Sequence, residues 1–340
     1  MKIFLFFFIL FNSPIIAQIV VEGKVTDEDN MPIYGASVYV NGTTIGTMTD
    51  SKGDFILHIP SELNTEIITS YIGYKTTYSV IQKNSFKLNI VLKQNVTELK
   101  EVVLSQNKFS RKQMLDIFRK NFLGTTKAGK NAIITNEDEI YFDYNNDNFV
   151  LTAFSDKPLL IDNPYLGYKI EYTLLEFSTT FYKSSININD AISSSFGGYS
   201  VFKETELSSK ISKRREKAYK GSFLHLFRNL AQEKWSKDEF LLFEGSFMVN
   251  SKEHFKIEKD SSKNMSEVFV EKQDRLLRKK GFIAEFSILY DQKEQSKIFF
   301  YTSKFSIDIF GLFTDYDKIY FSGDITKRKV GDLLPSNYGL

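Results

Sequence analysis

The sequence predicts a mainly β protein with some α-helix: a seven-stranded β-sandwich followed by an α+β domain with two main helices. Aromatic residues make up 15% of the chain, including 32 Phe and 18 Tyr, and aromatic and β-branched residues favour strands. Short alternating segments separated by turn residues fill the chain up to residue 93. Beyond residue 110, two segments repeat apolar residues at helical spacing.

Residues 1–17 are expected to be a secretory signal peptide. Lys2 precedes an apolar run over residues 4–11, which is followed by a break at Pro14 and by the small residue Ala17. The run is shorter than the roughly 20 residues that span a bilayer, and this order of features is typical of an export signal. Cleavage is expected after Ala17, and an uncleaved anchor is the alternative.

The chain has no cysteine, and its formal net charge is +2. Disulfides, thiolate metal sites and cysteine nucleophiles are therefore excluded. A net charge this small provides no overall field that attracts nucleic acid. We expect no nucleic-acid partner, and no transmembrane helix once the signal peptide is removed.

Residues 18–93 are expected to form an antiparallel sandwich of seven short strands. Turn-forming residues such as Asn41-Gly42, Lys52-Gly53 and Gly73 interrupt the alternating segments, a spacing typical of small sandwiches. The expected strands cover residues 19–26, 36–40, 44–49, 54–59, 66–72, 74–81 and 86–92.

The segment TDSKGDF at 49–55 is expected to be a hairpin turn and not a calcium loop. Asp50 can accept hydrogen bonds from the backbone shortly after it, and Gly53 can adopt a positive φ without strain at Cβ. A calcium loop places oxygen ligands at alternate positions, and Lys52 occupies one of those positions. His58 in the next strand is expected to be a packed or rim residue, so no metal site is predicted.

Residues 94–110 are expected to be a linker, and residues 111–340 an α+β domain. The apolar part of the linker, ELKEVVLS at 98–105, is interpreted as a strand that docks the two domains. Ser110 and Gln113 have the spacing of a capping box, and Gly124 can end the helix that they begin. The apolar face of this helix consists of Met114, Leu115, Phe118 and Phe122.

A second long helix is expected from about Lys213 to Trp235. His225 and Arg228 lie one turn apart on it and are expected to be a buried structural pair. Its apolar stripe consists of Tyr219, Phe223, Leu226, Phe227 and Leu230.

Basic residues gather at the start of this second helix and oppose its dipole. This conflict indicates a contact with anionic lipid headgroups or with an acidic partner, although an ordinary solvated face is the alternative. The predicted contact residues are Lys213, Arg214, Arg215, Lys217 and Lys220, with Lys210 nearby. A second basic cluster consists of Lys272, Arg275, Arg278, Lys279 and Lys280.

The first domain shows residues at characteristic positions of a known family. The matching residues are Gly23, Lys24, Val25, Pro32, Gly35, Ala36, Val38, Gly46, Thr49, Asp50, Gly53 and Phe55, with the run 70–74. Residues 20–92 thereby resemble the carboxypeptidase-type regulatory domain, a transthyretin-like β-sandwich. The segment at 98–105 resembles the one that follows this domain in outer-membrane nutrient receptors of the Bacteroidetes type. In those receptors it lies near a segment that a partner captures by strand addition.

The second part also resembles a known family. The segments FLGTT, PLLIDNPYLGYKIEYTL, RREKAYKGSFLHLFRNL and GDLLPSNY are similar to those of exported Bacteroidetes proteins. Those proteins carry the regulatory-type domain followed by a domain of unassigned function, so the resemblance implies architecture and export but no activity. The Glu-Gly-Phe usual in that family after the second helix is replaced here by Asp238-Glu239-Phe240.

No catalytic residue is predicted. A zinc carboxypeptidase needs a His-x-x-Glu motif, and none of His58, His225 and His254 has Glu at the third position after it. Around Ser200 the second glycine of a serine-hydrolase motif is missing, and phosphate-binding loops are absent from the sequence. Only the accessory sandwich of the peptidase is resembled, and we expect no cofactor and no metal.

These observations favour a non-enzymatic, exported, envelope-associated protein in the periplasm or at the outer-membrane surface, with the sandwich as a binding or docking module. Its partner would be an envelope protein or an anionic lipid surface. One alternative is a glycan-acting hydrolase or lyase with unidentified carboxylates. Another is an accessory protein of an outer-membrane transporter.

Overall fold

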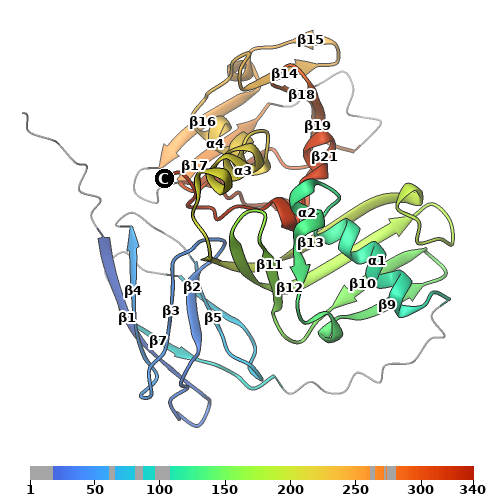
Figure 1. Cartoon of the computed structure of the whole chain (residues 1–340). Coiled ribbons are helices and arrows are strands. Elements are labelled where there is room, and N and C mark those ends of the chain that lie inside the picture. Colours follow the sequence, from blue (N-terminus) through green and yellow to red (C-terminus); the bar gives the residue numbers. More distant parts are fainter. Residues whose placement is uncertain are drawn as a thin grey trace, which may run out of the picture.

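The computed structural model describes residues 18–60, 66–80, 87–95, 108–260, 265–271, 273 and 281–340. It is a mainly β structure with four α-helices in these ranges. Figure 1 shows the N-terminal sandwich in blue beside a larger part built from strands and helices. The predicted fold class is therefore confirmed.

The sandwich contains the seven predicted strands in two sheets. One sheet has the order β4-β1-β7 and the other the order β3-β2-β5-β6. The strands are β1 (Gln18–Thr26), β2 (Ser37–Val40), β3 (Gly46–Met48), β4 (Asp54–Pro60), β5 (Glu66–Ser70), β6 (Thr77–Val80) and β7 (Lys87–Val91).

The expectation of a wholly antiparallel sandwich is wrong at one pair, because β7 runs parallel to β1. A hairpin can join only antiparallel neighbours in one sheet. β6 and β7 lie in different sheets, so the chain crosses between the layers and β7 takes the same direction as β1. The core between the sheets includes Val21, Val38, Phe55, Leu57, Ile59, Ile67 and Ile90.

The turn at Asp50 is a tight turn and not a calcium loop in its hydrogen bonding, but the prediction of a hairpin is wrong, because β3 and β4 lie in different sheets and do not pair. Within the described residues the same five-residue turn occurs at 27–31, 50–54 and 308–312. In each, Oδ1 of the first Asp accepts hydrogen bonds of 2.8–3.0 Å from the backbone N–H groups two and four residues later. The fourth residue has a positive φ and is Asn30, Gly53 or Gly311. His58 is exposed on β4.

The three turns differ in burial, which predicts opposite responses to pH at two of them. Burial raises the pKa of Asp308 to about 6, against the opposing effect of its backbone hydrogen bonds and of Arg228. At the exposed turn, bonds from the Asp54 and Lys52 N–H groups lower the pKa of Asp50 below its usual value. One turn geometry therefore favours the protonated acid when buried and the charged acid when exposed.

Asp308→Asn is expected to gain stability relative to the wild type as the pH rises. Asn keeps the Oδ1 acceptor but never ionises, whereas Asp308 loses its protonated form as the pH rises from about 4 through about 6. The difference in unfolding free energy between Asp308→Asn and the wild type should shift by about 2 kcal/mol over this range. It is measured by urea denaturation at several pH values. Asp50→Asn is the control. The difference between its unfolding free energy and that of the wild type should change with the opposite sign. A flat profile for Asp308→Asn would contradict the argument.

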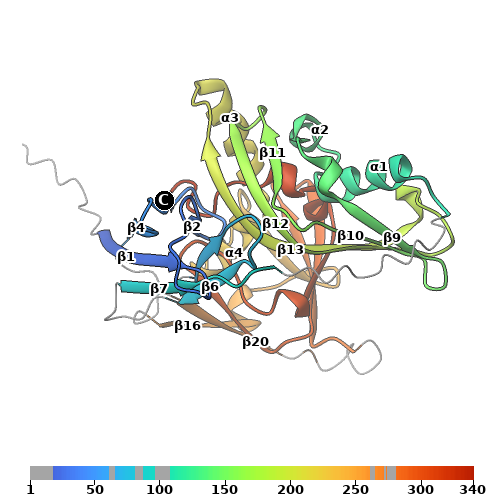
Figure 2. The same ribbon diagram turned by 90° about the horizontal axis from the view of Figure 1, so that it is seen from below.

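The next six strands form one sheet. Its order is β8-β11-β12-β10-β9, and β13 pairs along the other edge of β12. The strands are β8 (Ile133–Ile134), β9 (Tyr141–Asn145), β10 (Val150–Phe154), β11 (Leu159–Asn163), β12 (Tyr168–Phe181) and β13 (Ala191–Glu204). Figure 2 shows α1 (Arg111–Phe122) and α2 (Lys127–Asn131) on one face of this sheet.

The predicted first helix is confirmed with its capping box. The Ser110 hydroxyl accepts from the Gln113 N–H, and the Gln113 side chain accepts from the Ser110 N–H at 3.0 Å. Met114, Phe118 and Phe122 are buried, and Leu115 is half-buried. Gly124 follows the helix with φ +93°, so the chain turns away where it was expected to.

The single long second helix is a wrong prediction, because two shorter helices occupy this region: α3 (Ser209–Tyr219) and α4 (Phe223–Ala231). Gly221 lies between them with φ +73°, a conformation outside the helical region. Ser208 and Ser222 cap the two helices by accepting from the backbone N–H three residues later. Of the predicted stripe, Leu226, Phe227 and Leu230 are buried, while Tyr219 and Phe223 are half-buried.

The C-terminal part contains a five-stranded sheet, β15-β14-β18-β19-β21, and a three-stranded sheet, β16-β17-β20. Apolar residues of α4 and of both sheets share one buried cluster. The strands are β14 (Phe240–Glu244), β15 (Phe247–Met248), β16 (Phe255–Asp260), β17 (Met265–Val270), β18 (Ala284–Tyr290), β19 (Glu294–Phe300), β20 (Lys304–Asp308) and β21 (Ile319–Gly323). Short 3-10 turns include Asp324–Lys327 and Val330–Asp332.

Candidate functional site

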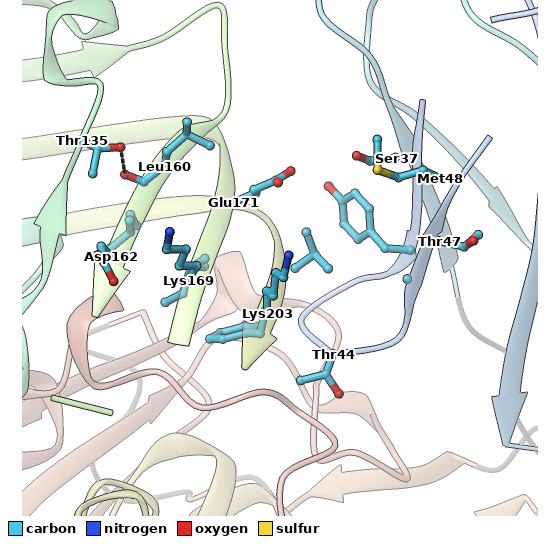
Figure 3. Close-up of a pocket in the computed structure, with 16 residues that line it drawn as sticks. Ser37, Thr44, Thr47, Met48, Thr135, Leu160, Asp162, Lys169, Glu171 and Lys203 are labelled. Atoms are coloured by element: carbon cyan, nitrogen blue, oxygen red, sulfur yellow. Dashed lines mark hydrogen bonds between the residues drawn. The ribbon is translucent and has the colours of Figure 1, made fainter. Parts of the chain in front are cut away.

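A cleft of about 540 Å³ lies between the sandwich and the six-stranded sheet. One wall comes from β2, β3 and the loop between them, and the other from β11, β12 and β13. Figure 3 shows that Glu171 and Lys203 project from the sheet into the space facing Ser37, Thr47 and Met48 of the sandwich.

The sheet wall follows from the alternation of strand side chains. Ile161, Ile170 and Phe202 point to the opposite face and are buried in the core under the helices. Their sequence neighbours Asp162, Lys169 and Lys203 therefore lie on the cleft face. Three adjacent strands thus place charged side chains in one row across the sheet.

Register brings these charges into direct opposition. Asp162 pairs with Lys169 across β11 and β12, and Lys169 pairs with Lys203 across β12 and β13. Like charges directly opposite each other destabilise a sheet. Within the described residues, none of the three makes an ion pair shorter than 4.0 Å, so their charges face the cleft.

The sandwich wall is polar and includes one buried phenol. Tyr39 alternates with the core residues Val38 and Val40, so it faces away from the sandwich core, yet it is only 3% exposed. Burial raises the pKa of the Tyr39 hydroxyl above its usual range, and the nearby Glu171 adds to this effect. The tyrosine therefore stays protonated and presents a neutral hydroxyl near Glu171.

The loop after β2 fixes the sandwich to the sheet. The Gly42 N–H donates to the Ser200 carbonyl at 2.6 Å, and the Phe202 N–H donates to the Thr43 carbonyl at 2.9 Å. The Ser200 N–H also donates to the Asn41 side chain at 3.0 Å. These bonds extend β13 by a short parallel bridge, so backbone hydrogen bonds from both parts hold the cleft walls.

The C-terminal tail and α4 add a second attachment. The Ser336 N–H donates to the Gly42 carbonyl at 2.6 Å, and Asn337 exchanges hydrogen bonds with Thr44. The Phe310 ring belongs to the buried core of the sandwich, while its carbonyl accepts from Arg228 Nε at 3.0 Å. The predicted linker is thus not the sole connection between the sandwich and the rest of the chain.

His225 and Arg228 are both buried, but they bind different partners. His225 Nδ1 accepts from the Gly221 N–H at 3.1 Å, and its Nε2 lies 2.6 Å from a Glu239 oxygen. Burial lowers the pKa of His225, and the Glu239 carboxylate opposes this shift. The two side chains have separate structural roles.

The predicted basic contact residues are divided by the structure. Lys213, Lys217 and Lys220 are exposed on α3, and Lys220 pairs with Glu216 at 2.6 Å. Arg214 is half-buried and donates to the Tyr165 carbonyl at 3.2 Å. These four remain a prediction, since their side chains border solvent.

Arg215 is a correction to that set. It is 3% exposed, donates to the carbonyls of Leu166, Gly167 and Glu206, and pairs with Glu204 at 2.5 Å. Its place on the inner face of α3 over the Tyr168 ring keeps it from contacting a membrane or partner. The second basic cluster, Lys272 to Lys280, and the segment at 98–105 lie outside the described residues.

The described part of the chain contains neither a metal-binding cluster nor a membrane-spanning helix. No group of three His, Asp or Glu side chains there could hold a metal ion. None of the helices there is both long and apolar enough to cross a bilayer.

Comparison with known proteins identifies the sandwich. Residues 21–104 match the family model described as the CarboxypepD_reg-like domain. The sandwich is therefore similar to the CarboxypepD_reg-like domain. The resemblance seen in its glycines and turn residues is thereby confirmed.

Relatives of the CarboxypepD_reg-like domain occur in larger receptors. The TonB-dependent receptor SusC of Bacteroides thetaiotaomicron is 37% identical over 87 residues, and the TonB-dependent receptor P39 of Formosa agariphila is 36% identical over 89 residues. Each match covers 26% of this chain and 8% of the receptor. A solved 9R-lipoxygenase from Cyanothece PCC8801 is 11% identical, covering 67% of this chain and 50% of its own, with a TM-score of 0.18, too low to indicate a shared fold.

The cleft residues were not found by sequence reasoning. Alternation in YKIEY at 168–172 and in SVFKE at 200–204 could have assigned Lys169, Glu171 and Lys203 to the exposed face of a sheet. No local pattern connects them to Tyr39, because the contact depends on a backbone bridge between residues far apart in the sequence.

Proposed function

We propose that this chain is a non-enzymatic, exported protein of the cell envelope, in the periplasm or at the outer-membrane surface, whose CarboxypepD_reg-like domain serves as a docking module. The single observation that carries the proposal is the cleft itself, which has one wall from this domain and one from the following sheet. A partner that enters the cleft would contact both parts of the chain at once.

The chemistry of the cleft suits a polar segment of a partner protein. It offers hydroxyl groups on Ser37, Thr44 and Thr47, and acidic and basic groups on the row described above. The sheet face carries both signs of charge, with Asp162 beside Lys169 and Lys169 beside Lys203. A partner with complementary charges would therefore be aligned as well as bound. The apolar side chains of Met48 and Val201 can cover uncharged parts of the bound segment.

The proposed envelope location is supported by the export signal that the sequence predicts at residues 1–17 and by the relatives. TonB-dependent receptors carry a domain similar to this one. This similarity favours a transporter of the outer membrane as the partner, which would make the chain an accessory protein of such a transporter. The backbone bonds between Gly42, Thr43 and β13 support a fixed recognition surface rather than a tethered domain.

The test places a photo-crosslinking amino acid in the cleft. Met48, which borders the cleft, is 63% exposed, and Ile56 on the outer face of β4 is 54% exposed, so the two positions are matched in accessibility and residue class. We expect Met48 substituted in this way to crosslink a TonB-dependent receptor in native membranes, identified by mass spectrometry, and Ile56 not to do so. Equal crosslinking from both positions, or none from Met48, would contradict the proposal.

A further inference from the structure

Another cavity, of about 470 Å³, lies beside α2 and α3. We call it the basic pocket. Its lining comes from α2, α3, the loop before β12 and the 3-10 turns near the C-terminus. It includes Arg214 and Lys217, two of the residues that the sequence singled out as a contact for anions.

Ion pairs divide the charges of the basic pocket into two groups. Arg328 pairs with Glu294 at 2.8 Å, and Lys327 pairs with Asp324 at 2.5 Å. Lys127, Arg214 and Lys217 make no ion pair within 4.0 Å in the described part of the chain. Three positive charges from two helices therefore border one cavity without an acidic partner.

The remaining acid in the basic pocket is Asp332, which makes no ion pair within 4.0 Å in the described part of the chain. Asp332 accepts a hydrogen bond from the Thr126 hydroxyl at 2.7 Å. Burial raises the pKa of Asp332 above its usual value. Asp332 therefore has a hydroxyl group, and not one of the three cations, as its side-chain hydrogen-bond partner.

Arg214 is held in position by an aromatic ring. Its guanidinium lies 4.2 Å from the centre of the Tyr165 ring, and one of its nitrogens donates to the Tyr165 carbonyl. Lys127 Nζ lies 6.0 Å from the centre of the same ring. Stacking fixes the planar fork of Arg214 and leaves its other N–H groups for an anion, an arrangement that suits phosphate oxygens.

We propose that the basic pocket binds a phosphate group, carried either by a lipid headgroup or by a small soluble phosphate compound. A phosphate monoester carries about −1.5 to −2 charges at neutral pH, which matches three unpaired cations better than a single carboxylate does. The volume lies within the range of known ligand pockets, about 300–1,000 Å³. This site is separate from the cleft, so either proposal can fail without the other.

The experiment compares two double variants. Arg214→Gln with Lys217→Gln removes two cations of the basic pocket, and the control Lys75→Gln with Lys112→Gln removes two exposed cations that do not line it. Binding of inorganic phosphate is measured by isothermal titration calorimetry at constant ionic strength. We expect the pocket variant to weaken binding at least about tenfold and the control variant to change it less than about twofold. Thermal unfolding of both variants checks that they fold.

Vesicles distinguish the two sources of phosphate. Co-sedimentation uses equal parts of phosphatidylcholine and phosphatidic acid, with pure phosphatidylcholine as the reference. Binding that free phosphate competes away, and that the pocket variant loses, supports a lipid headgroup; phosphate binding without vesicle binding supports a soluble compound. Arg214→Lys, which keeps the charge but not the stacked fork, should bind with intermediate affinity. No binding of either probe, or equal loss in both double variants, would overturn the proposal.

Discussion

Replacing Arg228 by Leu is expected to lower the free energy of unfolding by about 3–5 kcal/mol. The guanidinium is 7% exposed and donates to three carbonyls: Phe310 at 3.0 Å, Tyr338 at 2.8 Å and Ser336 at 2.6 Å. Leu matches much of the apolar volume but leaves those acceptors without donors. A buried acceptor that loses its partner costs about 1–3 kcal/mol.

The loss of stability should extend to the sandwich, because Arg228 lies where three parts of the molecule meet. It extends from α4, holds the loop that carries Phe310, and holds the C-terminal tail. The Phe310 ring fills part of the sandwich core, and the tail binds the loop at Gly42. We therefore expect faster hydrogen exchange at Ser336 and Gly42 in the variant, in addition to lower global stability in urea.

Two further variants test whether burial causes this effect. Arg228→Lys keeps a cation that can reach some of the carbonyls, so its loss should be intermediate. Arg119→Leu removes a surface arginine that pairs with Glu137 and should cost no more than about 1 kcal/mol. If Arg228→Leu cost no more than Arg119→Leu, the tail and the Phe310 loop would not depend on Arg228.

The sandwich could be predicted from the sequence because its signals are local. Asp50 and Gly53 fix one turn by bonds within five residues, and apolar alternation such as Phe55, Leu57 and Ile59 marks the buried face of β4. The parallel pairing of β1 with β7 was missed because it depends on which sheet each strand joins. No periodicity within a strand carries that information.

The second part was predictable only in pieces. The capping box at Ser110 identified α1, but the apolar stripe continued across Gly221 and concealed the break between α3 and α4. Ser208 and Ser222 are the cap residues that indicate this break. The sequence shows that basic residues gather on α3, but not that Arg215 points inward while Arg214 borders a cavity.

Gly53→Val is expected to destabilise the sandwich by about 2–6 kcal/mol, the sum of two costs. Gly53 has φ +76°, and holding a β-branched residue there costs on the order of 1–3 kcal/mol. A Cβ at this position would also lie 2.5 Å from the Val25 carbonyl oxygen and 3.1 Å from Pro32 Cβ. Overpacking of this kind adds about 1–3 kcal/mol, because the Val25 backbone belongs to the central strand β1 and cannot move freely.

Gly73→Val separates the two costs in the same domain. Gly73 has φ +85° but no atom within 4 Å of a Cβ built there, so it bears the backbone strain alone and should cost about 1–3 kcal/mol. Urea denaturation measures the total loss of unfolding free energy in each variant. Faster hydrogen exchange in β1 and β4 would show that Gly53→Val destabilises the strands beside the turn. Equal losses for the two variants would show that the contact with Val25 is relieved at no cost. A rise in the melting temperature of the wild type with calcium would instead contradict the interpretation of residues 50–54 as a purely structural turn. A turn that uses Asp50 Oδ1 for two backbone N–H groups leaves that oxygen poorly placed to bind a cation.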